Sequence, residues 1–482
     1  MQIHPHSSER IQHDVDKQTL INIFKGFLPQ PAILSHPEQL KPYECDALAA
    51  YQCLPWLVVL PETIDQVQAI LRNCFELGVP IIARGAGTGL SGGALPLANG
   101  VVMSLAKFSE ILEIDPANMM AIVQPGVRNL AISEAVAEHD LYYAPDPSSQ
   151  IACTIGGNVA ENSGGVHCLK YGLTTHNILR LKIVTMDGEL VTIGSHGLDT
   201  PGYDLLAIMT GSEGLLGVIV EVTVKLLPIP EHAQVILAAF DDIGKAGDAV
   251  AAIIADGLIP AGLEMMDNAV IRAAEDFIHA GYPVDAEAII LCEVDGTREQ
   301  VEEQLEQAQE LLKASGATQV TVAQNQQQRE LMWAGRKAAF PAVGRISPDY
   351  YCMDGTIPRR YLSEVLQSIA ELSKKYDLAV ANVFHAGDGN LHPLILYDAN
   401  IPGQLQKAEQ FGGEILELSI KVGGTITGEH GVGIEKINQM CIQFSRHELS
   451  QFHALKAAFD PSGLLNPRSE ERRVGKECRS RW

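Results

Sequence analysis

The sequence predicts an α+β fold in two parts, a strand-rich N-terminal domain and an α/β C-terminal domain. Its 482 residues correspond to roughly three average domains, or to two large ones. Hydrophobic residues make up 46% of the chain and charged residues only 20%, so the chain can bury large cores. Near residue 229, after two closely spaced prolines, short strands and glycine-rich loops give way to strands that alternate with helices.

Net charge and composition exclude several classes of function. With 35 Lys and Arg against 59 Asp and Glu, the formal net charge is −24, and this surface would repel a nucleic acid. We expect neither a signal peptide nor a membrane span, because no apolar stretch approaches the roughly 18 residues that a span needs. The nine cysteines form no CxxC motif, so we expect reduced thiols, a cytoplasmic location and no iron–sulfur cluster within this chain.

The N-terminal domain is expected to begin with a polar, largely helical segment up to residue 50. Residues 57–60 then predict a strand, and residues 61–78 an amphipathic helix with a capping box at Thr63 and Gln66 and an end at Gly78. Further strands are expected at 79–83, 100–105, 111–115, 120–126, 180–188, 189–193 and 217–227.

The C-terminal domain is expected to pack helices on one sheet. Strands are predicted at 234–240, 286–296 and 317–323, and a long helix at 297–316. Residues 379–397 predict two apolar strands joined by a two-residue turn at Asp388-Gly389.

A glycine-dense loop follows the strand at 79–83. The segment 83–94, ARGAGTGLSGGA, contains a GxGxxG match, but Pro96 follows where a Rossmann fold requires a helix, so that fold is disfavoured. Five glycines in nine residues can turn backbone N–H groups toward an anion, with Arg84 and Thr88 or Ser91 as further donors. The alternative is a glycine-rich turn without a ligand.

Two later stretches are also unusual. Residues 145–165, PDPSSQIACTIGGNVAENSGG, are polar and ill suited to any helix or long strand, and a loop of this length is usually functional. In residues 210–226, three glycines lead into a strand, although a hairpin entry explains that pattern equally well.

Together with KYGLTTHNI at 170–178, these motifs resemble the FAD-binding domain of the vanillyl-alcohol oxidase / p-cresol methylhydroxylase flavoproteins. Within that family they are most similar to the branch of the bacterial glycolate oxidase FAD subunits and D-2-hydroxyacid dehydrogenases. The resemblance runs from about Tyr43 to Pro467. It implies an FAD-binding domain at 1–228, a substrate domain at 229–450 and a C-terminal return at 451–467. The basic segment 468–482 falls outside it and is interpreted as a non-native tail.

The resemblance also implies which residues contact FAD. They comprise Arg84, Gly85, Ala86, Gly87, Thr88, Gly89, Leu90, Ser91, Pro145, Asp146, Ser149, Thr154, Gly156, Gly157, Asn158, Ala160, Ser163, Gly164, Gly165, Glu213, Gly214 and Ile219. Some relatives attach FAD through a side chain of the first glycine loop. Residues 84–94 contain no His, Cys or Tyr, so we expect non-covalent FAD.

The hairpin at 379–397 predicts a metal site. A turn at Asp388-Gly389 would place His385 directly opposite His392, with Cβ atoms about 5 Å apart, where both imidazoles can bind one ion. Glu429 is a third candidate ligand, and the adjacent His430 would point the other way along an extended chain. In the resembled dehydrogenases the matching His, His and Glu bind a divalent metal such as zinc or manganese, and the next histidine is the base.

The resemblance further implies that Arg336 binds the substrate carboxylate, although a surface arginine on a helix explains it almost as well. Cys352 stands where relatives for larger diacids have a lysine, which favours glycolate or D-lactate over 2-hydroxyglutarate. In the expected mechanism, His430 removes a proton from the metal-bound 2-hydroxy acid while hydride passes from Cα to the flavin.

The resemblance implies partners that accept the electrons. They include an iron–sulfur subunit, with onward transfer to quinone and peripheral association at the inner face of the membrane. Three alternatives remain open at this point. The first is a D-lactate or D-2-hydroxyglutarate dehydrogenase that acts without partner subunits, the second a flavin-free metallohydrolase, and the third a non-catalytic flavoprotein partner subunit, against which the metal-ligand set argues.

Overall fold

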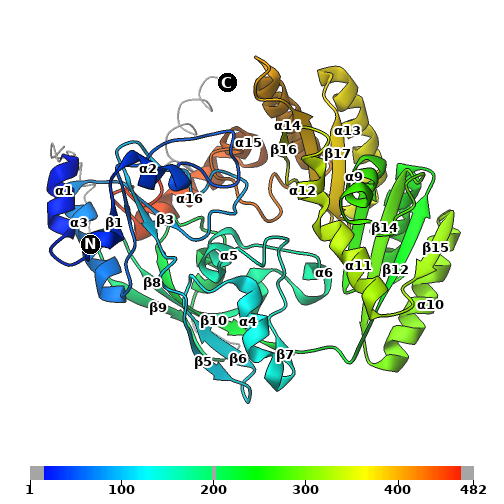
Figure 1. Ribbon diagram of the computed structural model, residues 1–482, viewed down its shortest axis with the longest axis horizontal. Coiled ribbons are helices and arrows are strands. Elements are labelled where there is room, and N and C mark those ends of the chain that lie inside the picture. The colour runs from blue at the N-terminus through cyan, green and yellow to red at the C-terminus, as the bar shows by residue number, and fades with distance from the viewer. Residues whose placement is uncertain (1–15, 198–201, 468–482) are drawn as a thin grey trace.

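The computed structural model describes residues 16–197 and 202–467, which form two domains side by side (Figure 1). The N-terminal domain runs from blue to green in Figure 1, and the C-terminal domain from green to brown. The last helices, in red, return to the N-terminal domain. The proposed non-native tail at 468–482 lies outside the described residues.

Two sheets and a small strand pair form the N-terminal domain. The first sheet has the order β1-β2-β4-β3, with parallel pairs except at β1, and the second is antiparallel with the order β5-β6-β10-β8-β9. The strands are β1 (Ile33–Leu34), β2 (Leu57–Val59), β3 (Ile81–Arg84), β4 (Val101–Ser104), β5 (Ile111–Asp115), β6 (Met120–Val123), β8 (Ile178–Val184), β9 (Leu190–Gly194) and β10 (Val218–Lys225). The small pair joins β7 (Leu141–Tyr142) and β11 (Leu227–Pro228).

The N-terminal helices are mostly short. They are α1 (Lys17–Phe24), α2 (Pro37–Leu40), α3 (Ile64–Leu77), α4 (Asn129–Val136), α5 (Ile155–Glu161), α6 (Cys168–Tyr171) and α7 (Leu205–Met209). The helix predicted at 61–78 is confirmed as α3: Thr63 accepts a hydrogen bond from the Gln66 N–H, and Gly78 ends the helix with φ 67°. In the described part of the first fifty residues, 16–50, the chain is less helical than expected, with α1, α2, two short 3₁₀ turns and strand β1.

A seven-stranded antiparallel sheet is the centre of the C-terminal domain, with the order β15-β12-β14-β13-β17-β18-β16. The strands are β12 (His232–Phe240), β13 (Gly262–Asp267), β14 (Ala288–Gly296), β15 (Gln319–Val322), β16 (Asp349–Cys352), β17 (Val380–His385) and β18 (Asn390–Tyr397). The helices are α8 (Ile243–Ala255), α9 (Asn268–Ile278), α10 (Arg298–Ala314), α11 (Gln326–Lys337), α12 (Ala339–Val343), α13 (Leu362–Tyr376) and α14 (Gln404–Lys421).

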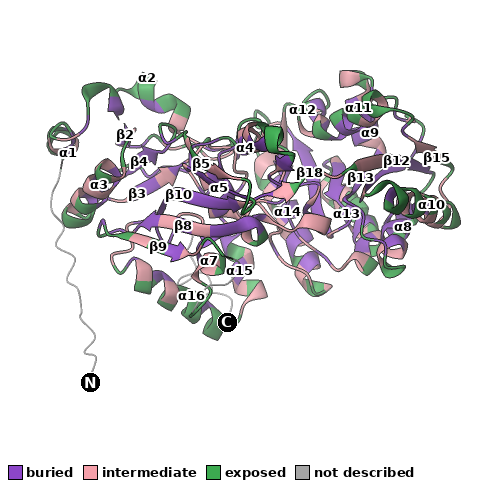
Figure 2. Cartoon of the chain, turned by 90° about the horizontal axis from the view of Figure 1, so that it is seen from below, coloured by how far each residue is buried: buried purple, intermediate pink, exposed green. Residues whose placement is uncertain are grey.

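Helices cover both faces of this sheet, and each face has its own apolar core. Residues alternate along β12, so Phe240 belongs to the core under α8, α10, α13 and α14, whereas Ala239 belongs to the core under α9, α11 and α12. Figure 2 shows the strands of both domains as largely buried and the helices with exposed outer faces. The sheet is therefore a rigid support for side chains that leave its edges.

The C-terminal return consists of α15 (Ile437–Gln443) and α16 (Arg446–Phe459). After α16, Leu465 forms a parallel β-bridge with Ile81 of β3. Within α16, buried Lys456 donates a hydrogen bond to the Leu215 carbonyl at 2.7 Å. The loop 424–436 before α15 contacts both domains, because its Val432 N–H donates to Glu213 and its His430 N–H to Asp354, and it places Glu429 and His430 between them.

Candidate functional site

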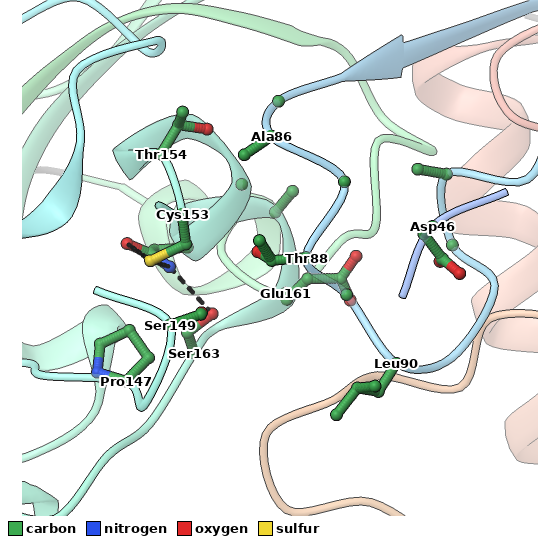
Figure 3. Close-up of a pocket in the computed structure, with 18 of the residues that line it drawn as sticks. Asp46, Ala86, Thr88, Leu90, Pro147, Ser149, Cys153, Thr154, Glu161 and Ser163 are labelled. Carbon is green, nitrogen blue, oxygen red and sulfur yellow. Dashed lines mark hydrogen bonds between the residues drawn. The ribbon is translucent and has the colours of Figure 1, made fainter. Parts of the chain in front are cut away.

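One cavity of about 540 Å³ lies between the domains and receives both groups of predicted residues. Its lining includes Arg84, Gly85, Ala86, Gly87, Thr88, Gly89, Leu90, Ser149, Thr154, Gly156, Gly157, Asn158, Ala160, Ser163, Glu213, Gly214 and Ile219 from the N-terminal domain. It also includes His385, His392, Glu429 and His430. Figure 3 shows Ala86 and Thr88 of the glycine loop beside the stretch that contains Thr154 and Ser163, with Leu90 farther along the loop.

The glycine loop presents free donors to this cavity. Among the described residues, no backbone N–H from Gly85 to Leu90 donates a hydrogen bond within the protein. Gly87 has φ 74°, and a Cβ atom there would collide with the Arg84 guanidinium. Arg84 is itself fixed by donating to the Cys45 carbonyl at 2.7 Å. Unsatisfied N–H groups beside a cavity suit a phosphate ligand, so this loop fits the pyrophosphate of FAD.

The stretch 145–165 contains a helix, which corrects the expectation that no helix fits there. Thr154 is the N-cap of α5, and Gly156 lets the helix approach Pro125, because a Cβ atom at Gly156 would lie 2.5 Å from the Pro125 Cβ. Asn158 receives a hydrogen bond from Asn129 at 3.1 Å. Glycine and asparagine are poor helix formers in isolation. They form α5 here because the close packing that they allow outweighs their low helix propensity.

Some predicted cofactor residues support the cavity without lining it: Ser91, Pro145, Asp146, Gly164 and Gly165. The Ser91 carbonyl accepts from the Ile434 N–H at 3.0 Å. Asp146 is paired with His167 at 2.8 Å. The Gly164 N–H donates to Glu429 Oε2 at 2.9 Å, which ties the N-terminal stretch to the opposite domain.

Sequence reasoning missed other lining residues, among them Asp46, Cys153, Glu161, Lys337, Phe340 and Tyr350. Cys153 and Glu161 lie within the polar stretch 145–165, so their place in the sequence indicated that they could line the cavity. Lys337 and Phe340 follow Arg336 on α11 and α12. The helical rotation of about 100° per residue turns Lys337 toward the cavity while Arg336 faces the sheet.

Two imidazoles and a carboxylate converge at the C-terminal side of the cavity. His385 Nε2 lies 3.1 Å and His392 Nε2 lies 2.9 Å from Glu429 Oε1. Burial opposes ionisation of Glu429, but the two histidines outweigh it and hold its pKa well below the ordinary value. His392 and Glu429 belong, with Asp354 and His430, to a group of side chains whose ligand atoms lie close enough together to hold one metal ion, and His385 adjoins that group through its contact with Glu429.

The predicted register of the histidine hairpin is wrong. His385 pairs with Asn390 and Val383 pairs with His392, so four residues rather than two form the turn. The error does not separate the histidines, because a shift of two residues keeps a side chain on the same face of the sheet. Their ring centroids are 5.1 Å apart.

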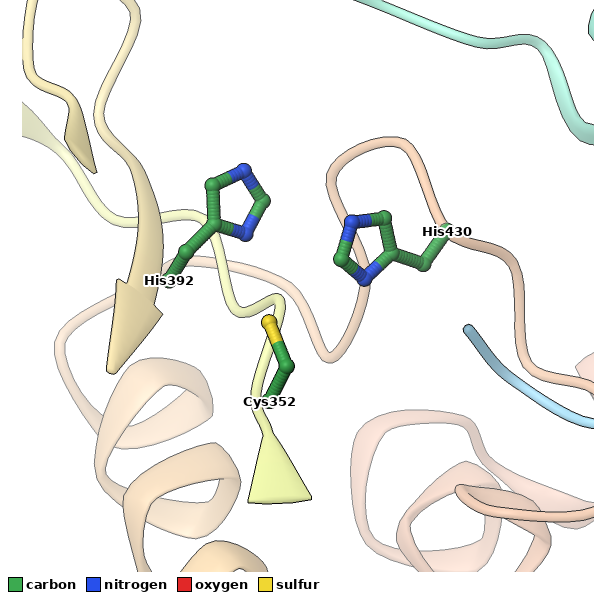
Figure 4. A group of neighbouring side chains, drawn as sticks. All are labelled: Cys352, His392 and His430. Carbon is green, nitrogen blue, oxygen red and sulfur yellow. The ribbon is translucent and has the colours of Figure 1, made fainter. Parts of the chain in front are cut away.

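Cys352 and Asp354 also lie near the histidines. Figure 4 shows the Cys352 side chain below the facing imidazoles of His392 and His430, with its sulfur directed toward them. Burial raises the pKa of the Cys352 thiol well above its ordinary value, which disfavours the thiolate that a metal requires. Asp354 accepts hydrogen bonds from the His430 N–H at 2.9 Å and from Lys436 at 3.2 Å. Asp354 therefore fixes the Glu429 loop, and its oxygens are already engaged.

His430 stacks on His392, with ring centroids 4.8 Å apart and planes 11° from parallel. Burial lowers the pKa of His430 to about 4. Its Nδ1 atom is buried and has no hydrogen-bond partner within the described residues. A neutral imidazole with a free nitrogen beside a cavity has the properties of a general base.

Arg336 does not line the cavity. Its side chain is 1% exposed, and its Nε donates to Glu264 Oε2 at 2.8 Å, with Nη2 at 2.6 Å from the same oxygen. The structure thus places Arg336 behind His385, and its role at a substrate carboxylate stays a prediction.

Comparisons with known proteins agree with this geometry. Residues 55–194 match the family described as "FAD binding domain", and residues 229–469 match "FAD linked oxidases, C-terminal domain". The glycolate oxidase subunit GlcD of Escherichia coli (strain K12) is 65% identical over 94% of this chain and 91% of its own length. The chain belongs to the FAD-linked oxidases. This FAD-linked oxidoreductase is also 32% identical to a D-lactate dehydrogenase of Anaerostipes hadrus, over 93% of this chain and 96% of the relative.

Solved structures show the same fold. The structure of p-cresol methylhydroxylase with substrate bound has a TM-score of 0.78 at 17% identity, over 94% of this chain and 96% of the other. The predicted vanillyl-alcohol oxidase / p-cresol methylhydroxylase type of fold is confirmed. Membership of the FAD-linked oxidases also leaves the flavin-free metallohydrolase without support. Within the described residues, no helix of this FAD-linked oxidase is both long and apolar enough to span a membrane.

Proposed function

We propose that this chain is the FAD-containing subunit of an enzyme that oxidises glycolate, a small 2-hydroxy acid, to the 2-oxo acid. One observation carries the proposal: a single cavity is lined both by the free N–H groups of the glycine loop and by His385, His392, Glu429 and His430. A relative named as a glycolate oxidase subunit, 65% identical over nearly the whole chain, supports the choice of substrate.

The N-terminal loops would hold FAD without a covalent bond. When bound, FAD supplies a two-electron acceptor. Gly85 to Leu90 would donate N–H groups to the pyrophosphate, and α5 and Glu213 would hold the adjoining loops in place. Cys153 lines the cavity, but burial raises the pKa of its thiol, and the side chain contacts Asn158. Thiols attack as thiolates, so this cysteine is poorly suited to a covalent link.

His385, His392 and Glu429 would hold a divalent metal, zinc or manganese. When bound, such a metal lowers the pKa of a coordinated hydroxyl group. His430 accepts the hydroxyl proton at its unpartnered Nδ1 atom, for which its burial beside His392 prepares it. Lys337 is a cationic side chain that α11 contributes to the cavity lining, and its charge would complement the substrate carboxylate.

Electrons then have to leave the protein. We propose that partner subunits, one of them an iron–sulfur protein, accept them and bring the chain to the inner face of the membrane. The relative's name as a subunit supports a multi-subunit enzyme. A second candidate activity, D-lactate oxidation, is favoured by the D-lactate dehydrogenase among the relatives.

An anaerobic substrate series tests the function. Purified flavoprotein is mixed with glycolate, D-lactate, L-lactate or D-2-hydroxyglutarate, and the absorbance of oxidised flavin is followed. We expect glycolate to bleach the flavin fastest and D-lactate more slowly. Fastest bleaching by D-lactate would select the second candidate, and bleaching by D-2-hydroxyglutarate alone would contradict the proposal.

A further inference from the structure

A buried carboxylate that no prediction included lies directly behind the candidate metal site. Glu264 is on β13, is 1% exposed, and belongs to a strand in which every residue is buried. In the register of β13 with β17, Met265 pairs with Phe384, so Glu264 comes next to His385 across the strands. A cross-strand pair of this kind brings two side chains onto one face of the sheet.

Both oxygens of Glu264 are engaged, and by different partners. Oε1 lies 2.8 Å from His385 Nδ1, and Oε2 receives the Arg336 Nε–H at 2.8 Å. The orientation of the Glu264 carboxylate is therefore fixed at two points.

The consequence for His385 is a defined tautomer. A carboxylate at Nδ1 requires the proton on Nδ1, which leaves the lone pair of Nε2 free. That Nε2 is the atom that lies 3.1 Å from Glu429 Oε1 and faces the candidate ligands. Carboxylates that accept the second N–H of a ligating imidazole orient it and raise its basicity.

We propose that Glu264 is the positioning residue for His385, and that Arg336 supports the site by holding Glu264. Arg336, Glu264 and His385 form one chain of charge-assisted contacts that ends at the metal site. Nε and Nη2 of Arg336 both lie beside Glu264 Oε2, and without the arginine Glu264 would be an uncompensated buried charge. The inference rests on the metal site of the proposed function and adds to it the two residues behind that site.

The chain offers a matched control for this arrangement. Glu293 on the neighbouring strand β14 is also buried, lies 3.2 Å from Arg329 and 3.3 Å from His167, and accepts the Trp333 N–H at 2.5 Å. It reproduces the Arg–Glu–His pattern away from His385, His392 and Glu429. A change at Glu293 therefore imposes a similar loss of a buried ionic network without touching the metal site.

The experiment measures metal affinity, not turnover. Wild type, Glu264→Gln, Arg336→Met and Glu293→Gln are stripped of metal and titrated with Zn²⁺ and Mn²⁺ against a chromophoric chelator. We expect Glu264→Gln to weaken binding by about 10–100-fold. Arg336→Met should weaken it in the same direction, whereas Glu293→Gln should leave it at the wild-type value.

The possible outcomes distinguish a failure of the positioning role of Glu264 from a failure of the proposed function. Wild type that binds neither metal would overturn the metal site itself. Wild-type affinity in Glu264→Gln would overturn the positioning role while the site stands. Unchanged metal affinity in Arg336→Met, with a raised KM for the 2-hydroxy acid, would show that Arg336 binds the substrate and does not act through Glu264. If Glu264→Gln does not fold, the double variant Glu264→Gln with Arg336→Met removes both buried charges and answers the same question.

Discussion

His430 is the imidazole of this group whose Nδ1 atom is buried without a hydrogen-bond partner among the described residues. The neighbouring His385 and His392 instead each place Nε2 beside Glu429. The His430 backbone N–H donates to Asp354, which fixes the main chain while the ring remains available. At the scale of single residues, proton acceptance and metal binding are thus divided between adjacent imidazoles.

The first prediction concerns His430→Gln. Loss of the general base should slow reduction of bound flavin by the 2-hydroxy acid about 10²–10⁴-fold. FAD content should stay at the wild-type level, because His430 belongs to the C-terminal side of the cavity. Anaerobic stopped-flow absorbance measures the rate, and His139→Gln on the surface near α4 is the control. Rapid flavin reduction in His430→Gln would remove His430 from this role.

The glycine loop after β3 acts as one element, because its function depends on backbone atoms. Residues Gly85 to Leu90 line the cavity, and their N–H groups have no partners in the described part of the protein. Gly87 is where this geometry is least tolerant, since its φ of 74° is left-handed and the Arg84 guanidinium occupies the space of a Cβ. A methyl group there strains the backbone and displaces a cation from the loop.

The second prediction compares Gly87→Ala with Gly257→Ala. Both glycines have a left-handed φ, 74° and 88°, but nothing lies within 4 Å of a Cβ at Gly257. Each variant should lose about 1–2 kcal/mol of stability from backbone strain. Only Gly87→Ala should also bind FAD more weakly, by at least about tenfold, in a fluorescence titration of the apoprotein. Equal FAD affinity in both variants would show that the loop does not hold the cofactor.

Elements with local signals were predictable from the sequence, and elements set by tertiary contacts were not. The α3 helix has a Thr63 cap, an amphipathic repeat and a terminal Gly78, all of which act within the element. The α5 helix has no such signal, because Gly156 is favoured only by the nearby Pro125. At the hairpin, the Asp388-Gly389 pair correctly predicted two paired strands, but the turn has four residues rather than two.

The residues of the candidate site were likewise predictable where the sequence carries a local signal, and not where tertiary contacts decide. His385, His392, Glu429 and His430 could be grouped because a two-residue slip keeps side chains on one face. Glu264 carries no signal of its own, since a glutamate in an apolar strand has meaning only once β13 is known to lie beside β17.

At the scale of the whole molecule, polar contacts join the two domains beside the cavity. Tyr171 of the N-terminal domain donates to Asp295 of β14 at 2.7 Å, and Lys170 is paired with the same carboxylate. His167 lies between two carboxylates, with Nδ1 2.8 Å from Asp146 and Nε2 3.3 Å from Glu293. Because the cavity is built from both domains, these contacts help to keep its two halves in register.

The third prediction is a pH-dependent contribution of His167 to this junction. Burial disfavours its charged form, but Asp146 and Glu293 outweigh burial and raise its pKa well above the ordinary value. A raised folded-state pKa stabilises the fold fully below the unfolded pKa of about 6.5, and this stabilisation is lost as the pH rises through the folded-state value. His167→Gln should therefore cost about 1.5–3 kcal/mol at pH 6, and progressively less toward pH 9.

Thermal denaturation of the holoprotein across this pH range measures the effect as the difference in Tm between variant and wild type. Lys170→Met is the matched control, because it breaks a contact at the same junction, with Asp295, and leaves His167 in place. Its difference from wild type should be constant with pH, whereas that of His167→Gln should shrink. The contact between Arg329 and Glu293 is present in both variants. A pH-independent difference for His167→Gln would mean that the imidazole is neutral and that the junction contains no protonated link.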